Sequence, residues 1–90
     1  MLDVMATARF KKDMKLVLKR GLNAQRLWDV VTLLRQQQPL PDQYRDHSLT
    51  GDYAGFRECH IQPDWLLVYR VQQDVLILTL ARTGTHSDLF

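Results

Sequence analysis

Three apolar runs separated by two short polar turns occupy residues 53–82, YAGFRECHIQPDWLLVYRVQQDVLILTLAR. The runs are rich in β-branched and aromatic residues and predict strands over residues 53–61, 65–71 and 75–82. The turns between them, QPD and QQD, are too short to hold crossover helices, so the three strands should form an antiparallel meander. This stretch therefore predicts the greater part of one β-sheet.

Two amphipathic helices are predicted ahead of the meander. Between a possible cap at Thr7 and a stop at Gly21, apolar residues recur at the spacing of one helical face, with a basic stripe beside it. A second helix should run from the cap Asn23 to about Gln36, where the Pro-Leu-Pro sequence at 39–41 ends it. Its apolar arc is wide, which fits packing against both the first helix and the sheet, or contact with a partner chain.

A short strand near residues 2–5 completes the expected order of strand, helix, helix and three strands. This order predicts the α+β class, with an antiparallel sheet packed against two N-terminal helices. The 90 residues, of which 46% are hydrophobic, suffice for one small core and not for two. We therefore expect a single domain over residues 1–90.

Charge is concentrated in the first half of the chain. Residues 1–46 hold nine Lys and Arg against five Asp and Glu, whereas residues 47–90 hold three against five. The basic stripe of the first helix consists of Lys11, Lys12, Lys15 and Lys19. Such a stripe is ordinarily a solvated helix face, but a polyanion such as RNA is the partner that it would attract.

Several classes of protein are excluded. The single cysteine, Cys59, forms no internal disulfide and no zinc finger, and no run approaches the roughly 20 apolar residues that span a bilayer. The start of the chain lacks the features of a signal peptide, so we expect a cytoplasmic protein with no membrane partner. The glycines are dispersed and no serine lies in a nucleophile-elbow motif, which argues against nucleotide hydrolysis and acyl transfer.

The three histidines all lie at an end or edge of the predicted strands. His47 precedes the first strand of the meander, His60 lies near its end with Asp64 in the next turn, and His86 follows the last strand. An antiparallel meander can bring such positions to one rim. Because imidazole both takes and gives a proton near neutral pH, a pair of histidines suits cleavage of RNA through its ribose 2′-hydroxyl.

Other residues could complete such a site. Arg82 could stabilise the phosphate, and Trp65 and Phe90 could stack on unpaired bases. There are structural alternatives. Each histidine could be a surface residue or a residue whose hydrogen bonds are satisfied within the fold, and Trp65, which opens an apolar strand, could belong to the core. A metal site built from His47 and the other imidazoles with Asp64 is a further possibility, but their spacing matches no compact ligand pattern.

Three segments identify a family. YRDHSLTG at residues 44–51, GFRECHIQPDWLLVY at 55–69 and RTGTHSDLF at 82–90 closely resemble the YafQ-type toxins of the RelE superfamily. The resemblance spans essentially the whole chain. It implies a RelE-like fold and a small bacterial ribonuclease that cuts messenger RNA in the A site of the 70S ribosome and is neutralised by a cognate antitoxin.

The resemblance also implies roles for individual residues. Catalytic roles fall on His47, His60, Asp64 and His86, with Trp65 and Phe90 in support. The implied chemistry needs no metal or other cofactor: the 2′-hydroxyl attacks and leaves a 2′,3′-cyclic phosphate and a 5′-hydroxyl. We assign His86 as the acid, Asp64 or His60 as the base, and His47 and Arg82 as phosphate binders.

The basic stripe and the second helix gain roles by the same resemblance. Lys11, Lys12, Lys15 and Lys19 become expected contacts with ribosomal RNA, and the wide apolar arc of the second helix becomes part of an expected antitoxin-binding surface. The alternative function is a non-catalytic RNA-binding or regulatory module that uses the basic helix. A metal hydrolase is the third option.

Overall fold

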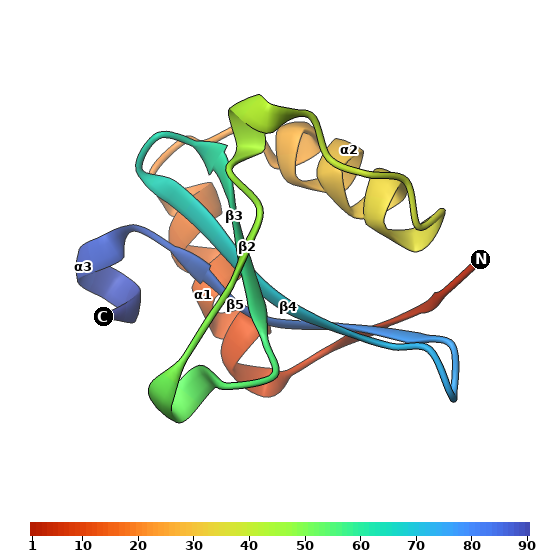
Figure 1. The fold of residues 1–90 in the computed structure, drawn as a ribbon. Helices are drawn as coiled ribbons and strands as arrows, with labels where there is room; N and C mark the ends of the chain where they lie inside the picture. Colours follow the sequence, from red (N-terminus) through yellow and green to blue (C-terminus); the bar gives the residue numbers. More distant parts are fainter.

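Five strands form one sheet in the order β1-β5-β4-β3-β2 in the computed structural model, which describes residues 1–90 (Figure 1). The strands are β1 (Asp3–Ala6), β2 (His47–Ser48), β3 (Arg57–Gln62), β4 (Trp65–Gln72) and β5 (Ile77–Gly84). The antiparallel meander β3-β4-β5 is confirmed. The short strand β1 joins it in parallel beside β5, and β2 extends it in antiparallel fashion beside β3.

Two helices precede the meander, as predicted. The helices are α1 (Ala8–Lys19) and α2 (Ala24–Arg35), with a third helix α3 (His86–Leu89) at the end of the chain. The hydroxyl of Thr7 accepts a hydrogen bond from the Phe10 amide, and the side chain of Asn23 accepts one from the Gln25 amide. Both predicted caps therefore satisfy amides that the helices leave free.

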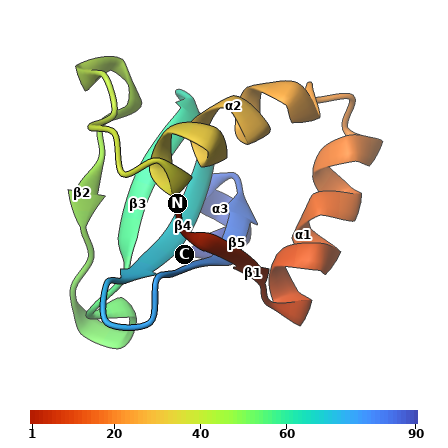
Figure 2. The same cartoon turned by 90° about the vertical axis from the view of Figure 1, so that its right-hand side faces the viewer.

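The apolar faces of α1 and α2 share one core with one face of the sheet. Alternate residues of the strands, such as Cys59, Leu67 and Leu80, are fully buried in this core. α1 lies beside the edge of the sheet that is farthest from β2 (Figure 2). There the Asp13 carboxylate accepts a hydrogen bond from the Thr83 amide at 3.1 Å. α1 thereby supplies an acceptor where β1 has ended and an amide of β5 has no strand partner.

The opposite face of the sheet is covered only in part. Leu66, Val68 and Ala81 form a small second cluster with Leu89 of α3. The structure thus confirms the α+β class with two N-terminal helices and adds a helical turn on the second face. None of the helices is long and apolar enough to cross a membrane.

The predicted ends of two strands are wrong by a few residues. β3 begins at Arg57 because a 3-10 turn occupies Gly51–Tyr53 and Gly55 adopts a φ of +90°. β5 begins at Ile77 because Leu76, with a φ of +55°, belongs to the turn. The sequence pattern did not predict β2 or α3.

Candidate active site

The three histidines converge on the partly covered face of the sheet. Glu58 and His60 alternate along β3 with Cys59, which is buried in the main core, so they project to the opposite face. The register of β2 places His47 opposite Glu58, and His86 begins α3. The ring centres of His47 and His60 lie 6.3 Å apart, and those of His60 and His86 lie 5.7 Å apart.

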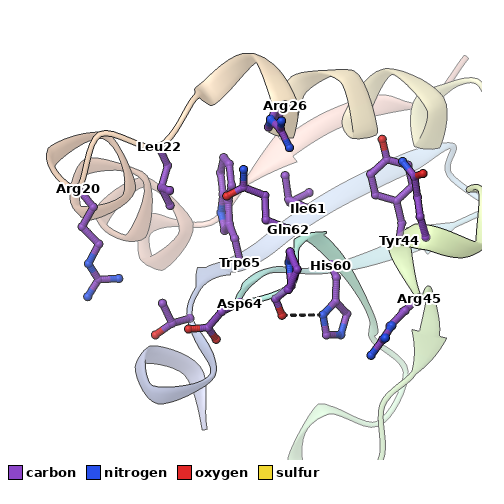
Figure 3. Close-up of a pocket in the computed structure, with 13 residues that line it drawn as sticks. Arg20, Leu22, Arg26, Tyr44, Arg45, His60, Ile61, Gln62, Asp64 and Trp65 are labelled. Atoms are coloured by element: carbon purple, nitrogen blue, oxygen red, sulfur yellow. Dashed lines mark hydrogen bonds between the residues drawn. The ribbon is translucent and has the colours of Figure 1, made fainter.

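Backbone carbonyls orient two of the rings. Nδ1 of His47 lies 2.7 Å from the carbonyl oxygen of Arg45. Nδ1 of His60 lies 3.2 Å from the carbonyl oxygen of Pro63, and Figure 3 marks this bond at His60 with a dashed line. A carbonyl oxygen only accepts hydrogen bonds, so each Nδ1 is the donor and carries a proton. In the neutral form of both rings, Nε2 is therefore the nitrogen that can accept a proton.

A carboxylate orients the third ring. Nδ1 of His86 donates to Oδ1 of Asp64 at 3.1 Å, and the His86 amide donates to the same oxygen at 3.3 Å. The bond from the His86 ring, followed by that from its amide, holds the pKa of Asp64 below its ordinary value. Asp64 is therefore ionised at neutral pH and placed to stabilise a protonated His86.

Glu58 is a member of this cluster that the sequence reasoning missed. Its carboxylate is buried, with one oxygen 3.9 Å from Nε2 of His47 and the other 3.7 Å from Nε2 of His60. Its position two residues before His60 on one strand could have identified it, because residues i and i+2 share a sheet face. The carboxylate therefore lies within reach of both rings and can face an imidazolium at either position.

The same groups are suited to a metal ion. One ligand atom from each of Glu58, His60 and His86 lies within 4.8 Å of the others. Imidazole and carboxylate are common ligands of zinc, and imidazole also suits copper. This set differs from the metal ligands considered from the sequence, since it includes Glu58 and omits His47 and Asp64.

Trp65 is a core residue. It is 1% exposed, and its indole N–H donates to the hydroxyl of Thr83 at 2.9 Å. The Thr83 hydroxyl in turn donates to the carbonyl of Leu66 at 2.6 Å. At this exposure the ring offers almost no surface for a base to stack on, which favours the alternative that Trp65 belongs to the core and supports the strands that carry the site.

Arg82 forms an ion pair with Asp13 of α1. Its guanidinium donates to both carboxylate oxygens of Asp13, at 2.7 and 3.2 Å. These bonds raise the pKa of Arg82 above its ordinary value. The side chain is 12% exposed. Arg82 therefore ties β5 to α1 through Asp13, and its assignment as a phosphate binder stays a prediction.

The remaining predicted residues are accessible. Phe90 is 61% exposed and meets the Tyr53 ring edge-on, with 5.8 Å between ring centres. The four lysines of the basic stripe are exposed along α1: Lys11, Lys12, Lys15 and Lys19. Phe90 can thus offer a ring to a base, and the stripe can offer charge to a polyanion.

Comparisons with known proteins agree with one family. The model of the family described as the bacterial toxin of a type II toxin–antitoxin system, YafQ, matches residues 2–90. The mRNA interferase toxin YafQ of Escherichia coli K12 is 39% identical over 89 residues, which cover 98% of this chain and 95% of that protein.

Two solved structures share the fold along the whole chain. A crystal structure of a metal-bound toxin from Helicobacter pylori has a TM-score of 0.94 and 43% identity, with 100% of both chains covered. The toxin in a crystal structure of the E. coli DinJ–YafQ complex has a TM-score of 0.90 and 38% identity, with 100% of this chain and 99% of that chain covered.

Proposed function

The chain belongs to the YafQ family of bacterial toxins of type II toxin–antitoxin systems, and on that premise we propose that it is an endoribonuclease that cleaves messenger RNA on the ribosome. One observation carries the proposal: three imidazoles, each fixed through Nδ1, gather on one face of the sheet. Acid and base groups held within one site are what cleavage of a phosphodiester at its 2′-hydroxyl requires.

In the proposed reaction, His60 is the base and His86 the acid. Nε2 of His60 takes the proton of the ribose 2′-hydroxyl, and the oxygen attacks the phosphorus. Nε2 of His86 gives a proton to the departing 5′-oxygen, which leaves a 2′,3′-cyclic phosphate and a 5′-hydroxyl. The lowered pKa of Asp64 makes it a weak base, so His60 is favoured over Asp64 for the first step.

The neighbouring groups stabilise the charges that form. Glu58 faces the imidazolium that His60 becomes after it takes the proton, and Asp64 faces the imidazolium of His86 before it gives one. A protonated His47, also beside Glu58, is placed to bind the phosphate oxygens that gain negative charge. Phe90 supplies a ring for a base that has left its stack.

Binding of ribosome and antitoxin is proposed for two other surfaces. The exposed lysines of α1 would hold ribosomal RNA through its phosphates, without reading sequence. Trp28 of α2 is 40% exposed beside the buried apolar face of that helix. We assign this surface to the cognate antitoxin, since E. coli YafQ forms a toxin–antitoxin complex with DinJ.

The test is messenger RNA cleavage in a purified translation system. The wild-type chain should cut ribosome-bound message and leave 2′,3′-cyclic phosphate ends. His86→Ala should cut about 100-fold more slowly or worse, with an unchanged melting temperature, while Ser87→Ala next to it serves as the control and cuts normally.

Two results would contradict this function. The first is cleavage of message by the His86→Ala chain at the wild-type rate, which would show that His86 is not the acid. The second result is that the chain arrests translation but leaves the message intact. If Lys→Glu changes on α1 abolish this arrest and histidine changes do not affect it, the non-catalytic RNA-binding module is favoured.

A second candidate property, metal binding, rests on the cluster of Glu58, His60 and His86. A related toxin from H. pylori has been crystallised with metal, and the ligand atoms here lie close enough to share one ion. We propose that zinc or copper binds this cluster and inhibits cleavage by occupying nitrogens that the acid–base reaction needs. Chelator should then raise or preserve activity, whereas loss of activity with chelator would favour a metal hydrolase.

A further inference from the structure

A cleft of about 690 Å³ opens beside His60. Figure 3 shows the residues that line it. It lies between the connection from α1 to α2, the 3-10 turn Asp42–Tyr44 and the turn from β3 to β4, and the buried side chains of Trp65 and Ile61 close it on the core side. His60 and Asp64 belong both to this cleft and to the catalytic cluster. The volume lies within the range of pockets that hold small ligands.

The cleft carries two positive charges that no ion pair neutralises, beside one ionised carboxylate, that of Asp64. Of its three arginines, Arg20 donates to both carboxylate oxygens of Asp88, at 2.5 and 3.1 Å. Arg26 and Arg45 are exposed, and neither has a carboxylate within 4.0 Å. Two free guanidinium groups at one cleft favour an anion, and their geometry matches the oxygens of a phosphate.

The backbone of Arg45 is a second, independent observation. Its φ of 49° and ψ of 44° are left-handed, a conformation that is costly for a residue with a Cβ. The Arg45 carbonyl accepts the Nδ1 proton of His47, but glycine would offer the same carbonyl without the strain. An arginine at this position therefore indicates a role for its side chain.

We propose that the cleft binds the nucleotide adjoining the cleaved bond, with its flanking phosphates held by Arg26 and Arg45. The inference rests on the proposed ribonuclease function and assigns part of the substrate to a defined place. The aromatic ring of Tyr44 and the amide groups of Gln43 and Gln62 also line the cleft. Such groups hold an unstacked base in protein–RNA complexes.

The test uses adenosine 3′,5′-bisphosphate as a probe, with binding to the free protein followed by NMR. The bisphosphate should shift the resonances of the cleft, and adenosine alone should bind more weakly. Arg26→Gln and Arg45→Gln should each weaken bisphosphate binding about tenfold. Arg9→Gln removes the same charge from the outside of the cleft and should leave binding unchanged.

Substitution of Arg45 separates its side chain from its backbone. Arg45→Gly keeps the carbonyl that orients His47 and relieves the left-handed strain, so it should not lower the melting temperature while it weakens binding as Arg45→Gln does. On ribosomes, both changes should raise KM for message and leave kcat unchanged.

The inference is overturned if Arg9→Gln weakens binding as much as the cleft variants do, or if the bisphosphate and adenosine bind equally well. If the wild-type chain binds the bisphosphate in the cleft but cuts no message, the proposed ribonuclease function is wrong and the binding site is supported. If the chain cuts message but the bisphosphate does not bind in the cleft, this inference is wrong and the proposed function stands.

Discussion

Replacing Trp65 by phenylalanine separates a core role from a substrate-binding role for this residue. The change removes the indole N–H that reaches the Thr83 hydroxyl at 2.9 Å, which costs about 1 kcal/mol for a buried hydrogen bond. The space vacated by the smaller ring costs about 1 kcal/mol more. The free energy of unfolding should therefore fall by about 2 kcal/mol, and the melting temperature by roughly 8–16 °C for a domain of this size.

Urea unfolding followed by far-UV circular dichroism measures the loss directly. Trp28→Phe is the matched control: Trp28 is 40% exposed, so its replacement should change the free energy of unfolding by less than about 0.5 kcal/mol. At a temperature where the Trp65→Phe chain is fully folded, it should cut message at the wild-type rate. An unchanged stability, or a cleavage rate more than about tenfold lower in the folded chain, would refute the core role.

Three further predictions concern ionisable groups. Burial raises the pKa of the Cys59 thiol, so a disulfide reagent should fail to label it at pH 8 in the folded chain and label it at once in urea; rapid labelling of the folded chain would contradict its burial. Arg20 holds the pKa of Asp88 in the folded chain below its ordinary value. The ion pair therefore stabilises the fold fully at any pH above the pKa of about 3.9 that the carboxyl has in the unfolded chain, and this stabilisation is lost as the pH falls toward the lower pKa of the folded chain. Asp88→Asn should thus be less stable than wild type near pH 7, with the difference shrinking in acid, and an equal difference at pH 2 and 7 would exclude this ion pair as the cause. Glu58→Gln should weaken zinc binding measured by calorimetry and relieve zinc inhibition of cleavage; unchanged affinity would remove Glu58 from the metal site.

The helices and the meander could be predicted because their causes are local. Thr7 and Asn23 cap the helices that they were expected to cap, and the alternation along β3 places Cys59 and His60 on opposite faces, as their adjacency requires. The approach of His60 to His86 followed from the meander, since neighbouring strand ends are close whatever their separation in sequence, whereas His47 joins them through the pairing of β2 with β3.

The parts that were missed depend on tertiary contacts. β2 has two residues, is polar and exists only through pairing with β3, so no periodic pattern marks it. α3 has four residues, but Thr85 and Asp88 form a capping box that a search for the Thr-x-x-acid pattern could have found. The pairing of Arg82 with Asp13 joins residues 69 positions apart, and nothing local to either residue predicts it.

The placement of β1 has a consequence for how the chain becomes toxic. β1 pairs with residues 77–80 of β5, and the Thr7 hydroxyl bonds to the Ala81 carbonyl, 74 positions along the chain. Contacts of such long range form late, because the intervening chain must first be ordered. The segment that completes the sheet leads directly into His86, so a nascent or prematurely ended chain lacks both the partner of its first strand and the proposed acid. Completion of the sheet and of the proposed site therefore depends on one segment, residues 77–86.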